Sequence, residues 1–203
     1  MIDGVLRQVK EKLLLPVAQR LSNRVSPTTL TLMAGIAGGL SAVAAWQGSN
    51  LLGLGLWWLN RTLDGLDGTV ARVSGRQSDW GGYLDLVLDF FVYTVIPFGL
   101  VMRQPSFEGL VILAFVYGMF YINAGAYLYL AALLERREQG AKQRGELTSI
   151  TMPGGVIEGT ESVIFFSLFF ILPDWFIPLL LLLGVLVAVS AVQRLVWAAR
   201  YLR

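Results

Sequence analysis

Residues 51–102 read LLGLGLWWLNRTLDGLDGTVARVSGRQSDWGGYLDLVLDFFVYTVIPFGLVM, two apolar runs that are joined by a short polar connection. Each run is about as long as the roughly 20 residues that a helix needs to cross the hydrocarbon core of a bilayer. Four aspartates interrupt the pattern, two where the first run ends and two where the second run begins. The stretch therefore predicts two antiparallel membrane helices that carry acidic residues at neighbouring ends.

The rest of the chain continues this pattern and predicts an all-α, polytopic membrane protein with six transmembrane helices. The predicted spans cover approximately residues 28–47, 51–70, 82–102, 110–134, 153–172 and 176–199. Before them, residues 1–24 mix cations with apolar residues at helical spacing, which predicts an amphipathic helix on the membrane surface. An ordinary positively charged N-terminus is the alternative. We expect one domain over residues 1–203, with 1–27 as juxtamembrane helix and loop and 28–203 as the six-helix bundle.

Composition excludes several classes of function. Of 203 residues, 55% are hydrophobic and 15% are charged, which is too apolar for a water-soluble core or for a disordered chain. The net charge of +2 offers no basic face, so we expect no nucleic-acid partner. The chain has no cysteine and no histidine, which excludes disulfides, thiolate metal sites and the commonest general base.

The distribution of cations predicts the orientation in the membrane. With six spans, 15 of the 16 Lys and Arg residues fall on one side, and Arg103 is the exception. Cytoplasmic loops carry such an excess of Lys and Arg. Both termini and the acidic helix ends are therefore predicted to be cytoplasmic, with the bacterial inner or plasma membrane as the expected location.

The four aspartates form two pairs, each on one face of a helix. Asp64 and Asp67 are three residues apart, and Asp85 and Asp89 are four apart. Four clustered carboxylates repel one another unless cations neutralise them. One alternative is a structural salt-bridge cluster with nearby arginines, namely Arg61, Arg72 and Arg76. The other is a pair of divalent ions, and oxygen ligands without His or Cys favour Mg²⁺ or Mn²⁺.

Small residues share the face of the first acid pair. Gly68 and Ala71 follow Asp64 by four and seven positions, and they would let a ligand approach the helix backbone. Arg72 is one turn beyond, where a guanidinium can meet a phosphate or a nucleobase edge. Helix packing is the simpler explanation for each small residue taken alone.

Together these residues resemble the signature of the CDP-alcohol phosphatidyltransferase family, D-x₂-D-G-x₂-A-R followed by G-x₃-D-x₃-D. Residues 64–89, DGLDGTVARVSGRQSDWGGYLDLVLD, match every fixed position, with eight residues between Arg72 and Gly81. The loop at residues 26–31, SPTTLT, is similar to the family's entry into the first span, with Thr28 where the family often has Asn.

The resemblance implies a divalent-metal-dependent transferase that moves a substituted phosphate from a CDP-alcohol to an acceptor alcohol and releases CMP. It implies that the signature aspartates hold two Mg²⁺ or Mn²⁺ ions and that Asp89 is also the catalytic base. By analogy CDP-diacylglycerol is the expected donor, so the enzyme would make phospholipids. The nucleotide site implied by the resemblance comprises Thr28, Thr29, Leu30, Thr31, Asp67, Gly68, Ala71, Arg72 and Ser78.

Other functions and partners stay open at this point. An ion-coupled transporter that uses the aspartates as its ion site is the main alternative function. A structural membrane protein with arginine-paired acids is a further one. A homodimer through the third and fourth spans is an expectation from family habit, and membrane lipids are the surrounding partners.

The acceptor site is predicted from polar residues near the fifth span. Glu158 and Glu161 share a helix face, with Thr160 between them and Tyr121 and Asn123 on the fourth span. Acids and hydroxyls without cations favour a non-phosphorylated alcohol, such as inositol, glycerol, serine or an amino alcohol. The alternative is that the two glutamates pair with the loop cations Arg136, Arg137, Lys142 and Arg144 as a solvated rim.

Overall fold

The computed structural model describes residues 2–138 and 154–202, and within these ranges it contains helices and connecting turns but no strand. The fold class is therefore all-helical, as predicted. The helices are α1 Ile2–Leu21, α2 Pro27–Trp46, α3 Asn50–Ser74, α4 Asp79–Arg103, α5 Phe107–Arg136, α7 Gly159–Ile171, the short 3-10 turn η1 Pro173–Trp175, and α8 Phe176–Tyr201.

Serine caps define where three of the long helices begin. The hydroxyls of Ser26, Ser78 and Ser106 accept hydrogen bonds from backbone N–H groups in the first turns of α2, α4 and α5 at 3.0–3.1 Å. The C-terminal end of α3 is set by Gly75, whose φ of 64° is a left-handed conformation that favours glycine. These local signals set the acidic ends of α3 and α4 opposite each other across a short turn.

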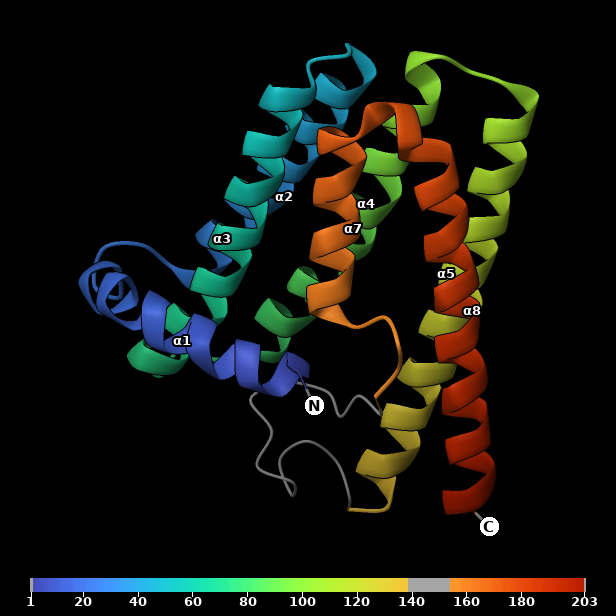
Figure 1. Cartoon of the computed structure of the whole chain (residues 1–203). Coiled ribbons are helices and arrows are strands. Elements are labelled where there is room, and N and C mark those ends of the chain that lie inside the picture. The colour runs from blue at the N-terminus through green and yellow to red at the C-terminus, as the bar shows by residue number, and fades with distance from the viewer. Residues whose placement is uncertain (1, 139–153, 203) are drawn as a thin grey trace.

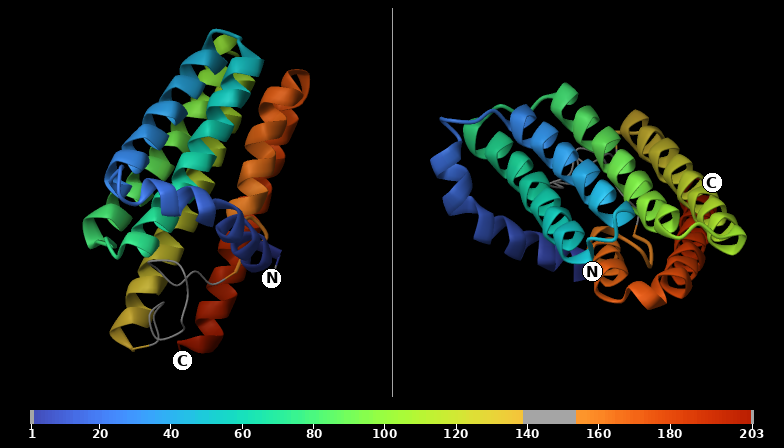
Figure 2. Two further views of the ribbon diagram at one scale, coloured as in Figure 1. Left: turned by 90° about the vertical axis from the view of Figure 1, so that its left-hand side faces the viewer. Right: turned by 90° about the horizontal axis from the view of Figure 1, so that it is seen from above.

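The long helices pack as a ring in the order α3, α2, α4, α5, α8, α7, and α7 returns to α3 (Figures 1 and 2). We expected α3 and α4 to be directly adjacent, and this is wrong in detail, because both pack chiefly on α2. The close approach depends on glycine. A Cβ on Gly38 of α2 would overlap Val92 of α4, and one on Gly99 of α4 would overlap the backbone oxygen of Ala42.

A core of aromatic and aliphatic residues fills the ring. Trp57 of α3 is fully buried and stacks on Phe166 of α7, with 5.0 Å between ring centres. Phe169 and Leu180 extend this core toward α8. The first half of α3, which precedes the signature residues, is thereby held against α7 by large side chains in close contact.

Four of the helical segments are long and apolar enough to cross a membrane: α2, α4, α5 and residues 173–201. They match the predicted first, third, fourth and sixth spans, and they make the chain an integral membrane protein. The predicted spans at 51–70 and 153–172 correspond to α3 and α7, which do not meet that test. The acids and Arg61 make α3 too polar, and the 13 residues of α7 extend only about 20 Å. The count of six spans therefore stays a prediction.

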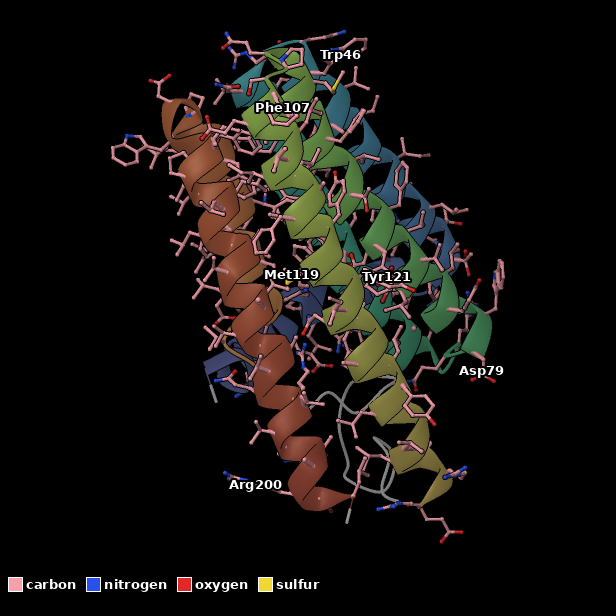
Figure 3. The ribbon with its side chains drawn as sticks, turned by 90° about the vertical axis from the view of Figure 1, so that its right-hand side faces the viewer. Trp46, Asp79, Phe107, Met119, Tyr121 and Arg200 are labelled. Atoms are coloured by element: carbon pink, nitrogen blue, oxygen red, sulfur yellow. The ribbon has the colours of Figure 1, made fainter. Side chains whose placement is uncertain are left out.

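The two ends of the bundle differ in character. Trp46 and Phe107 lie at one end, whereas Asp79 and Arg200 lie toward the other (Figure 3). Helix α1 crosses the outside of α3 near the second end (Figure 1). Its amphipathic, membrane-surface character stays a prediction. Lys142 and Arg144 of the predicted rim, and residue 153 at the start of the predicted fifth span, lie outside the described residues.

Candidate functional site

The four signature aspartates come from two helices on either side of α2. Asp64 and Asp67 lie in the second half of α3, and Asp85 and Asp89 lie in the first half of α4. Asp85 interacts electrostatically with each of the other three carboxylates. The structure thus places the four acids within electrostatic range of one another.

Asp67 is the most deeply placed of these acids. Only 5% of its surface is exposed, and its Oδ2 atom is buried without a hydrogen-bond partner. Thr31 of α2 is also buried and lies beside this carboxylate. A buried carboxylate oxygen without a partner is costly, and a bound cation would satisfy it.

Arg61, three residues before Asp64 on α3, is held from several sides. Its Nε donates to Asn60 Oδ1 at 2.6 Å, and its Nη2 donates to Asp89 Oδ1 at 2.6 Å. The guanidinium carbon lies 4.9 Å from the ring centre of Trp57 and 5.4 Å from that of Tyr93. A cation over the face of an aromatic ring is stabilised by it, so the Arg61 charge is fixed in place.

The contact between Arg61 and Asp89 is one of the ion pairs that the salt-bridge alternative predicts. Arg61 Nη1 also lies 3.8 Å from Asp64 Oδ2, so Arg61 interacts with an acid from each helix. Arg72 instead pairs with Glu11 of α1, with 2.8 Å between Nε and Oε1. Lys10 of α1 lies 3.8 Å from Asp64, and Asp67 keeps its unpartnered oxygen. One bound arginine and one distant lysine do not neutralise four carboxylates.

The donor atoms decide which metal the four aspartates could hold. Among the described residues, no three acidic side chains converge closely enough to hold one ion as they stand. Asp89 is instead drawn to Arg61. All the donors are carboxylate oxygens, however, and Asp67 offers a buried, unpartnered one. The chemistry of the set therefore fits Mg²⁺ or Mn²⁺ rather than a softer ion.

The residues predicted for the nucleotide lie at the same end of α2, α3 and α4. A Cβ on Gly68 would lie 3.3 Å from Arg72 Nη1, so the guanidinium lies over the bare backbone of this glycine. Ala71 is half-buried in the next turn. The Ser78 hydroxyl accepts a hydrogen bond from the Gly81 N–H, which makes it the cap of α4.

The first turn of α2 supplies the remaining predicted nucleotide residues. Thr28 is half-buried, and the Thr29 backbone N–H donates to the Ser26 hydroxyl. Leu30 is buried against Ala18 of α1. Thr31 lies beside Asp67 as a polar group, while Leu30 serves packing.

The predicted acceptor residues do not form one cluster. Tyr121 is 83% exposed on α5 (Figure 3), and Asn123 Oδ1 accepts a hydrogen bond from Arg194 of α8. Glu158 and Glu161 form a capping box at the start of α7. The Glu158 side chain accepts a hydrogen bond from the Glu161 backbone N–H, and the Glu161 side chain accepts one from the Glu158 backbone N–H. The sequence predicts ligand or rim residues at these two positions, and the structure shows that they cap a helix.

Arg194 is a residue that the sequence analysis missed. It is 5% exposed, and its guanidinium lies 5.4 Å from the ring centre of Tyr127. It also interacts electrostatically with Glu158. No local motif marks it, because its partners come from α5 and from the residues before α7, so only the assembled bundle reveals a buried cation here.

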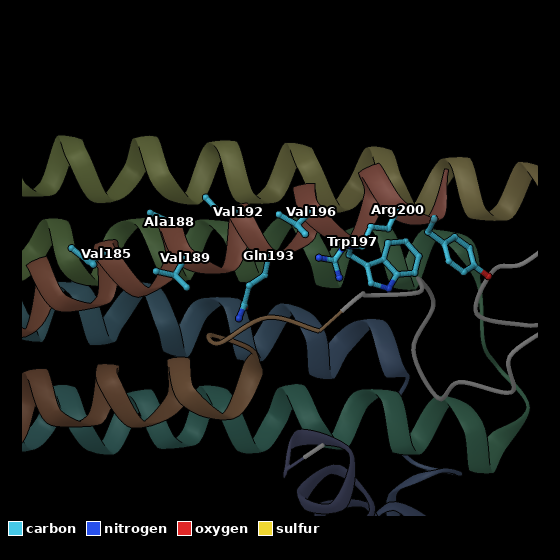
Figure 4. A pocket seen from close by; sticks show the side chains of 9 residues that line it. Val185, Ala188, Val189, Val192, Gln193, Val196, Trp197 and Arg200 are labelled. Carbon is cyan, nitrogen blue, oxygen red and sulfur yellow. The ribbon is translucent and has the colours of Figure 1, made fainter. Parts of the chain in front are cut away.

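One hollow lies away from the acids. It has a volume of about 830 Å³ and follows the outer face of α8 over residues 185–201, where Gln193 and Arg200 are its polar members (Figure 4). Its apolar lining suits the membrane interior. The hollow therefore contributes nothing to the chemistry of the aspartates.

Comparison with known proteins agrees with this geometry. The family model for CDP-alcohol phosphatidyltransferase matches residues 24–197. Inner membrane protein YnjF of Escherichia coli strain K12 is 32% identical over 174 residues, which are 86% of this chain and 82% of that protein. The bifunctional IPC transferase and DIPP synthase of Archaeoglobus fulgidus is 37% identical over 91 residues, 44% of this chain and 18% of that longer protein.

Solved structures share the fold at low sequence identity. Phosphatidylinositol phosphate synthase (PgsA1) of Mycobacterium tuberculosis with CDP-DAG bound aligns with a TM-score of 0.66 and 21% identity, over 91% of this chain and 92% of that chain. The same protein in complex with manganese and citrate aligns with a TM-score of 0.65 and 22% identity, over 91% and 88%. At these identities the likeness establishes the arrangement of helices.

Proposed function

Because the chain belongs to the CDP-alcohol phosphatidyltransferase family, we propose that it moves a substituted phosphate from CDP-diacylglycerol to an acceptor alcohol and releases CMP. The observation that carries this proposal is the complete signature, whose four aspartates lie together across α2 with a buried, unpartnered oxygen on Asp67. We infer that residues 1–203 act as one unit in a bacterial inner membrane, with the site on the cytoplasmic side.

Asp64, Asp67, Asp85 and Asp89 would hold two divalent ions. When bound, such ions neutralise the diphosphate of the donor and the charge that develops on departing CMP. Manganese in the complex of the structurally similar PgsA1 supports this assignment. Mg²⁺ and Mn²⁺ both suit the oxygen donors.

The chain's own residues divide the remaining work. Asp89 accepts the proton of the acceptor hydroxyl as that oxygen bonds to the phosphorus, while the bond from phosphorus to the CMP oxygen breaks. Arg61 orients Asp89 through the 2.6 Å contact. Arg72, with Gly68 beneath it, faces the nucleotide, and Thr31 closes the site beside Asp67. Thr28, Thr29, Leu30, Ala71 and Ser78 complete the wall that we assign to the cytidine diphosphate.

For the acceptor we retain a non-phosphorylated alcohol. The buried Arg194 adds one cation near the predicted acceptor region, but Asn123, Tyr127 and Glu158 already engage it. A phosphate-bearing acceptor calls for several cations. Purified enzyme given CDP-diacylglycerol with a panel of alcohols, followed by mass analysis of the lipid, tests this; turnover with glycerol 3-phosphate alone would contradict it.

The role of Asp89 is tested by Asp89→Asn, with Asp79→Asn as the matched control on the same helix. Loss of the base should lower CMP release by at least about 100-fold, while the protein stays folded. Asp79 is exposed in the first turn of α4, so its variant should keep near-normal turnover. Normal turnover in Asp89→Asn would overturn the assignment of the base.

Two wider proposals have their own measurements. Uptake of an ion or solute into liposomes, without any nucleotide chemistry, would favour the transporter alternative over the transferase.

A homodimer through α4 and α5 would place their exposed aromatic residues, such as Phe91, Phe98 and Phe115, against a second copy. Cross-linking in native membranes that yields only monomer would remove the dimer.

A further inference from the structure

Helix α1 lies against the signature half of α3. Ala18 of α1 is fully buried and packs with Leu66 and Val70 of α3 and with Leu30 of α2. The apolar side of α1 is therefore docked on the two helices whose ends carry the nucleotide residues. Such packing fixes which turns of α3 the polar side chains of α1 contact.

From that docked position, α1 directs two neighbouring charged side chains at signature residues. Glu11 Oε1 accepts a hydrogen bond from Arg72 Nε at 2.8 Å. Lys10 Nζ lies 3.8 Å from Asp64 Oδ2, and its side chain covers Gly65 so closely that a Cβ there would overlap it. Lys10 thus contacts an acid and Glu11 contacts the arginine, so each contact joins opposite charges.

The contact with Glu11 leaves the rest of the Arg72 guanidinium available. Arg72 has five N–H donors, and Glu11 accepts from Nε. Nη2 lies 3.4 Å from Thr69 Oγ1, and Nη1 lies over Gly68. Glu11 of α1 therefore holds the Arg72 guanidinium at Nε, and α3 supports the rest of the side chain. The terminal nitrogens lie beside Gly68, a small residue of the signature.

We propose that Glu11 is a positioning residue for the donor nucleotide, which acts by holding the Arg72 guanidinium in the orientation that receives a phosphate or the cytosine edge. The inference rests on the proposed function, because it takes Arg72 as a nucleotide-binding residue. Without Glu11, the long Arg72 side chain rotates among many conformers, and binding must order it again. α1 therefore contributes directly to the site rather than only to membrane attachment.

The test uses Glu11→Gln and Glu11→Ala in the full-length purified protein, with the exposed neighbour Lys12→Gln as control. CMP affinity is measured by titration calorimetry in detergent with Mn²⁺ present, and KM and kcat are measured with CDP-diacylglycerol. Glu11→Ala should weaken CMP binding and raise the donor KM by about 5- to 20-fold, because a charge-assisted contact that orders Arg72 is lost. The kcat at saturating donor and the acceptor KM should change by less than about twofold.

Further variants separate positioning from structure. Glu11→Asp keeps the carboxylate and should recover part of the CMP affinity. Combining Glu11→Gln with Arg72→Lys should cost little more than Arg72→Lys alone, since the two residues act as one unit. The melting temperature of Glu11→Gln should stay within about 2 °C of wild type, as expected for a partly exposed ion pair.

The outcomes distinguish this inference from the proposed function. Wild type that binds CMP while both Glu11 variants bind it equally well would overturn the inference and leave the function standing. Additive losses with Arg72→Lys, or a large fall in melting temperature together with lost kcat, would show that Glu11 is structural. Wild type without CMP binding or turnover would overturn the proposed function and the inference with it.

Discussion

At the scale of single residues, Arg61 links two of the four acids to the helices around them. Only 10% of its side chain is exposed, and it spans the gap between α3 and α4 through Asp89. Asn60, which fixes the Nε of Arg61, is itself anchored to the Ala34 carbonyl of α2 at 2.8 Å. The cation is thereby tied to all three helices that surround the acids.

Replacing Arg61 should destabilise the metal-free protein more than the metal-bound protein. Arg61→Gln leaves Asp89 without its partner, at a cost of roughly 2 kcal/mol once the 29% exposure of the Asp89 side chain is allowed for. That corresponds to a fall of about 4–8 °C in melting temperature for a chain of this size. With saturating Mn²⁺ the fall should shrink, because the ion supplies positive charge to the same carboxylate.

The measurement is a thermal melt in detergent with chelator and then with Mn²⁺. Arg61→Lys is the conservative variant. It keeps the charge but loses the planar group that reaches Asn60 and Asp89 together, so its melting temperature should lie between those of wild type and Arg61→Gln. An equal loss in both conditions would mean that the arginine and aspartates form a purely structural cluster. That result would return weight to the salt-bridge alternative.

The individual site residues were predictable from sequence where spacing along one helix fixes their faces. Asp64 with Asp67, and Asp85 with Asp89, follow from separations of three and four residues. Lys10, Glu11 and Arg194 were not predictable as site residues, because their partners are 54, 61 and 71 positions away in the chain. Their positions depend on tertiary packing that no local pattern encodes.

At the scale of helices, α2 determines the distance between the two acid-bearing helices. Its small residues Gly35 and Gly38 face Leu88 and Val92 of α4, and Gly38 also lies near Asn60 of α3. Of Gly35, Gly38 and Gly39, the tightest contact is at Gly38. The alternation of apolar runs predicts sequential pairing of helices and does not reveal which third helix lies between them.

Two neighbouring glycines of α2 offer a matched test of this role. A Cβ on Gly38 would overlap Val92, whereas one on Gly39 would meet the Phe91 ring at an ordinary 3.6 Å. Gly38→Ala should therefore destabilise the protein by about 1–3 kcal/mol, through overpacking that pushes α4 away. Gly39→Ala should be neutral or stabilise by about 0.4–1 kcal/mol, because alanine restricts the unfolded chain.

Thermal melts of both variants, together with Mn²⁺ titrations, check this expectation. Gly38→Ala should also weaken Mn²⁺ binding, since Asp85 and Asp89 move with α4. Equal stability and equal Mn²⁺ affinity in the two variants would mean that α2 does not set the separation of the acids.

At the scale of the whole molecule, the ring of helices places the acids at one end and three short turns at the other. Turns at Gly48, at Gln104 and at η1 lie at the end opposite to α1 and the C-terminus (Figure 1). The number of long apolar runs predicted the helices well. It could not predict that α7 is short, because a capping box at Glu158 and Glu161 begins that helix within the apolar run.

The last prediction concerns the six crossings, and the absence of cysteine makes it directly measurable. If α3 and α7 cross the membrane as α2, α4, α5 and α8 are long enough to do, the connecting turns must alternate in side. Single cysteines are introduced in otherwise native protein, and intact cells and inside-out vesicles are treated with an impermeant maleimide. We expect labelling from outside at Ser49→Cys, Gln104→Cys and Asp174→Cys, and from the cytoplasmic side at Gln77→Cys, Arg136→Cys and Arg200→Cys. Labelling of positions 49 and 77 from the same side would show that α3 does not cross, and positions 136 and 174 test α7 in the same way. Either result would lower the count. Failure of α3 to cross would also move Asp64 and Asp67 out of the bilayer, which would remove the membrane cost that makes a counter-cation necessary there.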